Sequence, residues 1–308
     1  MTDDRVSDAR FMALALSLGR RGQGNVWPNP AVGCVITQGP RIVGRGWTQP
    51  SGRPHAEPQA LAQAGEAARG ATVYVTLEPC SHHGKTPPCA QALIDAGVAR
   101  VVIATQDDDA RVNGRGIAML RTAGIEVEVG VRESEARADH AGFFCRTDLG
   151  RPMLTLKLAN SFDGRIATGT GESQWITDAP ARRLTHAMRS RHDAVMVGAG
   201  TARKDDPSLT VRGLGVAHQP ARVVVSRRLD LPLMGQLART ASDIPLILCH
   251  GSDADPALVR TWSDLGATLL PCAARGAQLD PVDVLRQLAS HGLTRIFCEG
   301  GSALAASL

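Results

Sequence analysis

A chain of 308 residues is long for a single hydrophobic core, and its length predicts two domains. With 43% hydrophobic and 21% charged residues, the composition excludes a disordered polypeptide, and no apolar run approaches the roughly 18 residues of a membrane span. The net charge of +4 is mild, the arginines are scattered, and only five Phe, four Trp and one Tyr could stack on bases. Nucleic-acid binding is therefore disfavoured.

The N-terminal segment and the cysteines indicate a cytoplasmic protein. Residues 1–21 carry acidic side chains where a secretion signal would be positively charged, and their apolar residues are spaced as on one face of a helix. Seven cysteines, an odd number, argue against a disulfide framework. We therefore expect a soluble cytoplasmic chain whose thiols are free or bound to a metal.

The first half of the chain alternates between helical and strand-like patterns. Helices are expected over residues 1–21, 56–68, 88–97, 114–124 and 133–144. Strands are expected over residues 31–36, 41–47, 72–77, 100–105 and 125–131, the first two forming a hairpin. The polar segment at 145–152 contains Gly150 and Pro152, so we place the domain boundary near Thr147.

The second half, residues 148–308, alternates in the same way and shows no repeat of fixed period. Strands are expected over residues 153–159, 193–198, 221–226, 244–249, 267–270 and 295–300. Helices are expected over residues 179–190, 256–266 and 281–292. Asp280 followed by Pro281 is a well-formed helix start. Both halves thus predict the α/β class.

His55, Cys80 and Cys89 form a set of three candidate zinc ligands. A structural zinc has four protein ligands as a rule, whereas three are typical of a catalytic zinc that keeps one position for water. Glu57 follows His55 by two residues and is placed to transfer protons beside the metal. His-Ala-Glu followed by Pro-Cys is the signature of zinc deaminases.

Two alternatives to a small-molecule deaminase remain open from these residues. One is a nucleic-acid base deaminase with an unrelated appendage, although such enzymes tend to have two residues between the cysteines and this chain has eight. The other is a structural zinc module that binds partners, which would need a fourth ligand and would leave Glu57 without a task.

Seven longer motifs follow one another along the chain. They are "PNPAVGCVI", "HAE" and "PCSHHGKTPPC" in the first half, and "LKLANSFDGRIA", "GESQWIT", "DDPSLTVR" and "EGGSAL" in the second. Together they resemble the bifunctional riboflavin-biosynthesis deaminase/reductase family. The resemblance implies a cytidine-deaminase-like, zinc-dependent domain over 1–147 and a dihydrofolate-reductase-like, NADPH-dependent domain over 148–308. The implied reactions are hydrolytic deamination of 2,5-diamino-6-(5-phosphoribosylamino)pyrimidin-4-one and reduction of its ribose to a ribityl chain.

The resemblance also implies roles for residues of the first half. It assigns His55, Cys80 and Cys89 to zinc and Glu57 to proton transfer, and it places further side chains on the substrate: Asn29, His82, Lys85 and Asp107. His83 is interpreted as a solvated loop residue. Asp109 stands where the family tends to have asparagine, and a carboxylate near a ligand phosphate would be repulsive, so its role stays open.

In the second half no G-x-G-x-x-G follows a strand. Two strands end in glycines, in "VMVGAGT" and "IFCEGGSAL", which alone is a weak signal for a phosphate site, and the nucleotide site itself is implied by the resemblance. The cofactor positions are Ala159, Trp175, Thr201, Asp205, Gly300 and Gly301. The substrate positions are Lys157, Ser173, Arg189, Leu209, Arg212 and Glu299. The two arginines among them are suited to clamp a sugar phosphate.

The implied partners are a phosphorylated pyrimidine, Zn²⁺, NADPH and further copies of the chain, with no nucleic acid and no membrane. The family pattern continues beyond Leu308, so we expect a C-terminally truncated, incomplete reductase domain with an open sheet edge.

Overall fold

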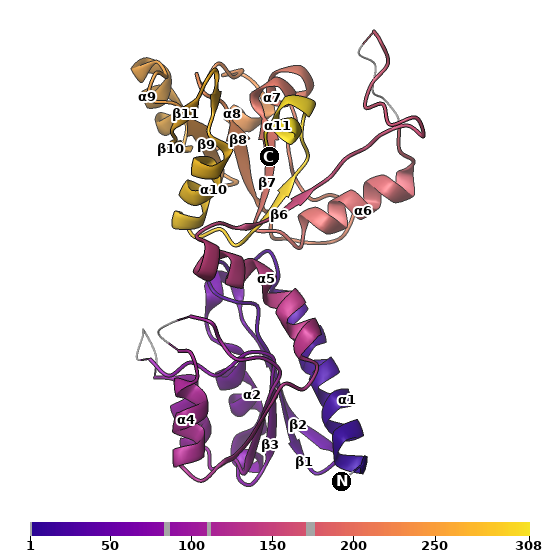
Figure 1. Cartoon of the computed structure of the whole chain (residues 1–308), viewed down its shortest axis with the longest axis vertical. Coiled ribbons are helices and arrows are strands. Elements are labelled where there is room, and N and C mark those ends of the chain that lie inside the picture. The colour runs from indigo at the N-terminus through magenta and orange to yellow at the C-terminus, as the bar shows by residue number, and fades with distance from the viewer. Residues whose placement is uncertain (1, 83–86, 110–111, 171–175) are drawn as a thin grey trace. The chain divides into compact units, whose positions relative to one another are not determined.

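The computed structural model describes residues 2–82, 87–109, 112–170 and 176–308. It divides into two compact units, Met1–Leu149 and Gly150–Leu308. Each unit contains its own sheet with helices on it, and helices and strands alternate along both (Figure 1). The α/β class predicted from the sequence is confirmed.

The first unit contains a five-stranded sheet in the order β2-β1-β3-β4-β5. Its strands are β1 (Gly33–Gln38), β2 (Arg41–Trp47), β3 (Thr72–Val75), β4 (Arg100–Ile103) and β5 (Glu126–Val129). β1 runs antiparallel to β2 and β3, and β3, β4 and β5 are parallel. The expected hairpin is therefore β1–β2, with Gly39 at a positive φ of 55° in its turn.

Helices cover both faces of this sheet because side chains alternate along each strand. The helices are α1 (Thr2–Gly19), α2 (Ala56–Ala64), α3 (Cys89–Asp95), α4 (Arg115–Thr122) and α5 (Glu133–Leu149). Val35 and Tyr74 pack with apolar residues of α1, whereas Cys34 and Ile36 pack with those of α2 and α3. Three 3-10 turns, Arg20–Gly22, Pro50–Gly52 and Gly65–Ala68, complete the unit.

Helix α5 is longer than the sequence predicts. We expected a polar linker after residue 144, but the helix continues to Leu149. No glycine or proline occurs between residues 145 and 149, so nothing there ends a helix. Gly150 adopts a φ of 62°, which is the left-handed conformation that ends helices.

Helix α2 lies unusually close to β2. A Cβ on Gly46 would lie 2.1 Å from the carbonyl oxygen of Ala56, and one on Gly44 would lie 2.2 Å from that of Ala60. Only glycine allows the two backbones to approach in this way. The first turn of α2, and with it the adjoining His55, is thereby fixed against the sheet.

The second unit contains a six-stranded, fully parallel sheet in the order β10-β9-β8-β7-β13-β6. Its strands are β6 (Met153–Leu156), β7 (Ala194–Gly198), β8 (Ala221–Val225), β9 (Leu246–His250), β10 (Thr268–Pro271) and β13 (Arg295–Cys298). A small hairpin joins β11 (Ala274–Arg275) to β12 (Gln278–Leu279). Within the part of the chain that the structure describes, β6 pairs with β13 alone and forms one edge.

The helices of this unit are α6 (Ala179–Arg189), α7 (Ala199–Asp205), α8 (Gln236–Arg239), α9 (Pro256–Asp264), α10 (Pro281–Ser290) and α11 (Ser302–Ser307). The sequence predicts α6, α9 and α10, and Asp280 caps α10 by accepting from the N–H of Val282. We did not predict α7 and α8, which have 7 and 4 residues and are too short for a helical period to show. Helix α11 begins where the sequence indicates a helix after Gly301.

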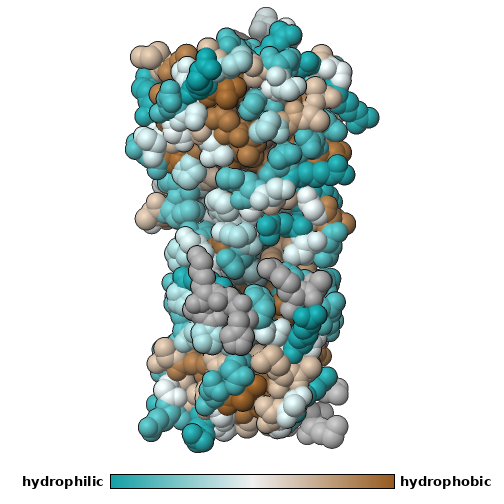
Figure 2. Space-filling model, turned by 90° about the vertical axis from the view of Figure 1, so that its left-hand side faces the viewer, coloured by the Kyte–Doolittle hydropathy of each residue, from teal (hydrophilic) through white to brown (hydrophobic). Residues whose placement is uncertain are grey.

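The face of the molecule in Figure 2 is mainly hydrophilic, with smaller hydrophobic areas in both units. Among the described residues, no helix combines the length and the apolar character that crossing a membrane requires.

We expect Gly46→Ala to destabilise the first unit by at least about 1–3 kcal/mol, because the new methyl group overlaps a backbone carbonyl that cannot rotate away. Denaturant unfolding and zinc content measured on the same sample test this, since displacing α2 also displaces His55. The control is Gly169→Ala, whose methyl group would meet no atom within 4 Å among the residues that the structure describes. Equal stability of both variants and the parent would contradict the proposed role of this contact.

Candidate functional site

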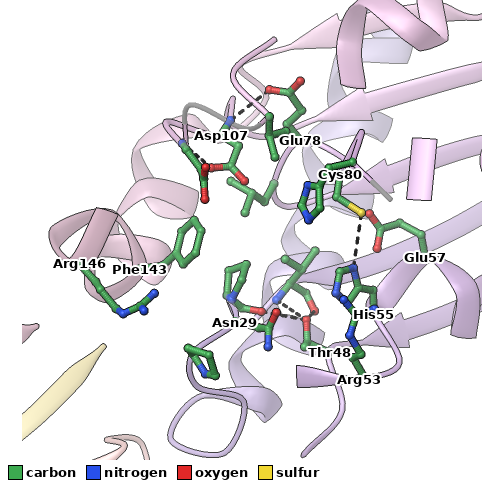
Figure 3. A pocket seen from close by; sticks show the side chains of 17 residues that line it. Asn29, Thr48, Arg53, His55, Glu57, Glu78, Cys80, Asp107, Phe143 and Arg146 are labelled. Carbon is green, nitrogen blue, oxygen red and sulfur yellow. Dashed lines mark hydrogen bonds between the residues drawn. The ribbon is translucent and has the colours of Figure 1, made fainter. Parts of the chain in front are cut away.

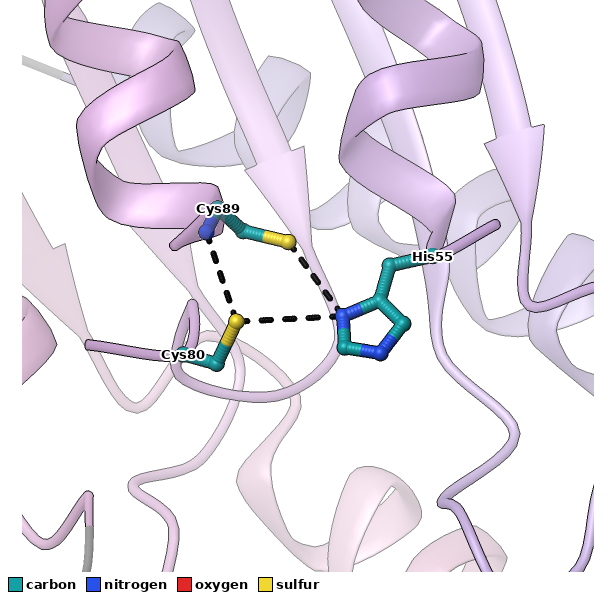
Figure 4. A group of neighbouring side chains, drawn as sticks. All are labelled: His55, Cys80 and Cys89. Atoms are coloured by element: carbon teal, nitrogen blue, oxygen red, sulfur yellow. Dashed lines mark hydrogen bonds between the residues drawn. The ribbon is translucent and has the colours of Figure 1, made fainter. Parts of the chain in front are cut away.

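Three side chains from separate segments of the first unit converge on one point. His55 precedes α2, Cys80 lies in the loop after β3, and Cys89 is the first residue of α3 (Figure 4). Their ligand atoms all lie within 4.8 Å of one another. His55 Nδ1 is 3.3 Å from Cys89 Sγ and 3.8 Å from Cys80 Sγ.

These distances fit a zinc ion. Zinc–nitrogen and zinc–sulfur bonds of about 2.0 and 2.3 Å in a tetrahedron place the two ligand atoms roughly 3.6 Å apart. The observed nitrogen–sulfur separations of 3.3 and 3.8 Å lie on either side of this value. Among the described residues no fourth His, Cys, Asp or Glu joins the cluster. The donor set therefore suits a zinc site with one open position.

The local electrostatics also favour a cation. Hydrogen bonding from the Cys89 thiol lowers the pKa of Cys80 to about 4, which favours the thiolate form that binds a cation. The same contact raises the pKa of Cys89 above its usual value, and the contact with Cys80 raises the pKa of His55. The backbone N–H of Cys89 donates to Cys80 Sγ (3.3 Å), which holds this sulfur toward the cluster.

Glu57 lies in the first turn of α2, directly beside this cluster (Figure 3). Its side chain is 3% exposed. Burial, followed by the negative charge of Cys80, raises the pKa of Glu57 to about 6. A carboxylate with such a pKa can both accept and donate a proton near neutral pH.

The cluster opens into a cavity of about 290 Å³. Among the residues that line it are six that the sequence predicted for the site: Asn29, His55, Glu57, Cys80, His82 and Asp107. Cys89 is buried behind the wall, and Lys85 and His83 lie outside the described residues. The Nδ1 atom of His82 is buried without a hydrogen-bond partner among the described residues.

One wall of the cavity is organised by Glu78, which sequence analysis missed. Its buried carboxylate accepts hydrogen bonds from the backbone N–H groups of Gly114 (2.9 Å), Ile117 (3.2 Å) and Asp107 (3.3 Å). Asp107 in turn accepts from the N–H of Asp109 (2.9 Å), and burial raises the pKa of Asp107 to about 7. The sequence signal for Glu78 was its place two residues before Cys80.

Other wall residues gave no sequence signal. These are chiefly Thr48, Arg53, Phe143 and Arg146. Phe143 and Arg146 come from α5, more than 50 residues beyond the zinc ligands in the chain. Figure 3 shows both on the side of the cavity away from His55.

A second cleft, of about 600 Å³, lies in the second unit. It is lined by residues that follow β7, β8 and β13 and by part of the β11–β12 hairpin. Of the predicted cofactor residues, Thr201, Asp205 and Gly301 line it. Ala159 and Gly300 are not among the lining residues that the structure describes.

The backbone around this cleft leaves room for a nucleotide. A Cβ on Gly200 would meet no atom of the described residues within 4 Å. The N–H of Gly301 donates to Thr201 Oγ1 (2.9 Å) and joins the turns after β13 and β7. Glycine-containing turns allow close approach of a phosphate-bearing ligand to backbone N–H groups. The residues present therefore fit a dinucleotide.

The predicted substrate residues of this unit lie partly together. Arg189 donates from Nε and Nη2 to the carboxylate of Glu299 (2.5 and 2.9 Å). Leu209 and Arg212 line an open pocket of about 480 Å³ together with Arg189. Arg189 is therefore already paired with Glu299, and a phosphate that binds Arg189 would bind a guanidinium group that also contacts this carboxylate. Lys157 is placed at the end of β6, where its N–H donates to the carbonyl of Cys298 (2.8 Å).

Two further predicted residues, Ser173 and Trp175, lie outside the described residues.

Two sequence models of known families match the chain. Residues 5–105 match the cytidine and deoxycytidylate deaminase zinc-binding region, and residues 152–308 match the RibD C-terminal domain. The second match extends to the last residue of the chain and does not test the incomplete reductase domain that we expected.

Curated relatives match over nearly the whole chain. The riboflavin biosynthesis protein RibD of Aquifex aeolicus is 42% identical over 297 residues, covering 96% of this chain and 82% of the relative. RibD of Escherichia coli is 42% identical over 309 residues, covering 98% of this chain and 84% of the relative.

Solved structures of proteins of the same kind also match the chain over nearly its whole length. A Thermotoga maritima diaminohydroxyphosphoribosylaminopyrimidine deaminase/5-amino-6-(5-phosphoribosylamino)uracil reductase superposes with a TM-score of 0.86 at 35% identity, covering 99% of this chain and 84% of that one. Acinetobacter baumannii RibD gives a TM-score of 0.84 at 38% identity, covering 98% and 82%. The chain belongs to the RibD family of bifunctional deaminase/reductase proteins of riboflavin biosynthesis.

Proposed function

We propose that the first unit deaminates 2,5-diamino-6-(5-phosphoribosylamino)pyrimidin-4-one and that the second reduces the ribose of the product with NADPH. The main support for the deamination is the cluster of His55, Cys80 and Cys89, which opens to a cavity. The buried carboxylate of Glu57 lies beside this cluster. A structural zinc module, the alternative left open by the sequence, is disfavoured because the described residues supply no fourth ligand.

In the deamination, each protein group has a distinct task. A zinc ion held by His55, Cys80 and Cys89 would supply Lewis-acid activation of the attacking water, whose pKa such ions lower to about 7. Glu57 accepts the proton of this water as it attacks the carbon that bears the exocyclic amine. Glu57 passes this proton to the adjacent ring nitrogen, then accepts the proton of the newly formed C–OH group and donates it to the amine. The C–N bond breaks, the carbonyl forms, and the amine leaves as ammonia.

The cavity walls hold the pyrimidine in position for this attack. Asn29 and Asp107 line the cavity and offer polar groups to the ring. His82 contributes a buried nitrogen that has no partner among the described residues and is therefore available to a ligand. Lys85 completes the proposed substrate contacts from outside the described residues.

In the reduction, the nicotinamide cofactor supplies the hydride and the protein supplies its position. Thr201, Asp205 and Gly301 line the cleft that we assign to NADPH. Further proposed cofactor contacts come from Ala159, Trp175 and Gly300. The proposed substrate contacts are Lys157, Ser173, Arg189, Leu209, Arg212 and Glu299, with the arginines facing the sugar phosphate.

Three broader expectations stay predictions. We assign the deaminase to residues 1–147 and the reductase to 148–308. We also expect the chain to work in the cytoplasm and to form a homo-oligomer.

We expect the chain to bind about one zinc ion and Cys89→Ser to lose it together with ammonia release, because a hydroxyl is a poor replacement for a zinc thiolate. Metal analysis of purified protein measures this. Cys145→Ser, which changes a thiol on α5 away from the cluster, should keep both properties. Full zinc content in Cys89→Ser would refute the ligand assignment.

We expect Glu57→Gln to slow ammonia release by about 10²–10⁴-fold, because an amide cannot carry protons. Zinc content and NADPH oxidation with the deaminated intermediate should be unchanged. Glu66→Gln makes the same change at an exposed position and should behave like the parent. Ammonia release within a few-fold of the parent would rule out the proton-transfer role, whereas loss of zinc would make Glu57 a ligand.

We expect Asp205→Ala to raise the KM for NADPH by roughly 2- to 10-fold, the typical effect of losing one hydrogen-bonding group. Deamination should be unaffected, because Asp205 belongs to the other unit. Asp264→Ala on α9 removes a carboxylate from an exposed position that does not line the cleft and serves as control. Reductase kinetics equal to the parent's would remove Asp205 from the cofactor site.

A further inference from the structure

Glu78 is a buried carboxylate that the proposed deamination steps do not use. It follows β3, and only Pro79 separates it from Cys80. Its side chain is 3% exposed, and it lines the cavity of the first unit. Burial of a carboxylate costs free energy unless hydrogen bonds compensate for the lost water. The partners of Glu78 therefore show what this carboxylate holds in place.

The hydrogen-bond donors that the structure describes for this carboxylate all come from one stretch of chain after β4. Oε2 accepts from the backbone N–H groups of Asp107 (3.3 Å) and Gly114 (2.9 Å), and Oε1 accepts from that of Ile117 (3.2 Å). Asp107 lies at the beginning of the loop 107–114, and Gly114 lies at its end. Glu78 therefore ties the two ends of this loop together.

The loop 107–114 forms part of the cavity wall. Its residues Asp107, Asp109 and Val112 line the cavity, and Figure 3 shows Asp107 next to Glu78. The carboxylate of Asp107 accepts from the N–H of Asp109 (2.9 Å). The main chain of Asp107 is thus held by Glu78 and its side chain by the loop itself.

The first turn of α4 packs closely on the segment that contains Glu78. A Cβ on Gly116 would lie 2.1 Å from the carbonyl oxygen of Pro79 and 3.2 Å from Glu78 Oε1. Glycine allows the backbone of α4 to approach this segment, which continues into Cys80. The wall that carries Asp107 and one of the candidate zinc ligands are therefore attached to the same three residues, 78–80.

We propose that Glu78 is a positioning residue for the deamination, which holds Asp107 at a fixed place relative to the zinc cluster so that Asp107 binds the pyrimidine ring. The proposal rests on the proposed function of the first unit and adds a residue that acts through Asp107. Because Asp107 would contact the substrate both before and during the reaction, its displacement should weaken substrate binding and leave the chemical step largely intact. Glu57, in contrast, is expected to act on kcat.

The test measures kcat and KM for ammonia release from the diamino substrate by zinc-loaded Glu78→Gln. The amide has nearly the same shape but replaces one acceptor oxygen with an NH₂ donor, so it cannot accept on both sides. We expect the KM to rise by about 10-fold, the order of magnitude of one lost hydrogen bond, and kcat to stay within about 3-fold. The zinc content should equal that of the parent.

A double-mutant cycle with Asp107→Ala separates positioning from a general structural role. Asp107→Ala removes the side chain that Glu78 is proposed to place. In this background Glu78→Gln should raise the KM further by less than about 2-fold, because both changes act on one interaction. A residue that merely stabilises the fold would instead give independent, additive effects.

Asp8→Asn is the matched control. Asp8 is also a buried carboxylate of the first unit, accepts from the hydroxyl of Tyr74 (2.8 Å), and is not among the described residues that line the cavity. We expect this variant to unfold at a lower denaturant concentration than the parent without an increase in KM.

Gly116→Ala tests the same contact without changing the carboxylate. Its methyl group would push the first turn of α4 away from Glu78 and Pro79. We expect the KM to rise as in Glu78→Gln, and the Asp107→Ala background to remove most of this effect. If Glu78→Gln does not fold, Gly116→Ala decides the question.

The outcomes separate the inference from the function on which it rests. A KM of Glu78→Gln within about 2-fold of the parent's, an equal rise in Asp8→Asn, or additive effects in the cycle would overturn the role of Glu78. Loss of zinc from folded Glu78→Gln would overturn it as well, because the carboxylate would then support the metal cluster. No ammonia release by the folded, zinc-loaded parent would instead refute the proposed deaminase, and the inference with it.

Discussion

The close packing of α2 on β2 is the constraint on which the deaminase site depends. Gly44 and Gly46 let the helix backbone approach the sheet at distances that any side chain would prevent. This contact fixes the N-terminus of α2, and therefore both His55 and Glu57, relative to the sheet. The cysteines reach the same point from the end of β3 and the start of α3, so three elements of one sheet unit assemble the cluster.

The two buried carboxylates of this site have different tasks because their neighbours differ. Glu57 is buried beside a thiolate, and its pKa rises to about 6, which suits a group that exchanges protons. Glu78 is equally buried but accepts three backbone N–H groups, an arrangement that holds a wall in place. In the second unit, ion pairs such as Arg189–Glu299 and Arg203–Asp230 likewise fix side chains next to the clefts.

The sequence predicts the features that show as a local pattern of residue types, namely the metal-site motif and the longer helices and strands. The zinc-site residues were predicted because the chemistry of a metal site demands particular residue types, and the longer helices and strands because burial imposes a period. The role of Glu57 stays a prediction from the same pattern. Glu78 was missed because its partners are backbone groups about 30 to 40 residues away, which no side-chain pattern reveals. Phe143 and Arg146 were missed because only the folding of α5 brings them to the cavity.

The cleft of the second unit that we assign to the cofactor was also only partly predictable from the sequence. The glycines after β7 and β13 gave a weak signal by themselves, and the resemblance to a known family supplied the rest. The sequence could not show that Arg203 pairs with Asp230 and Arg227 with Asp253, because such pairs form only in the fold. Arg189 was assigned to a phosphate from its motif, and its pairing with Glu299 became visible only in three dimensions.

The central claim is that one chain performs both reactions in succession. The most direct measurement supplies the diamino substrate and NADPH together to the zinc-loaded protein and follows ammonia and NADPH in the same reaction. The account predicts that ammonia is released first and that NADPH is oxidised afterwards, in equal molar amounts. NADPH oxidation that begins without ammonia release, or ammonia release that is never followed by oxidation, would contradict it.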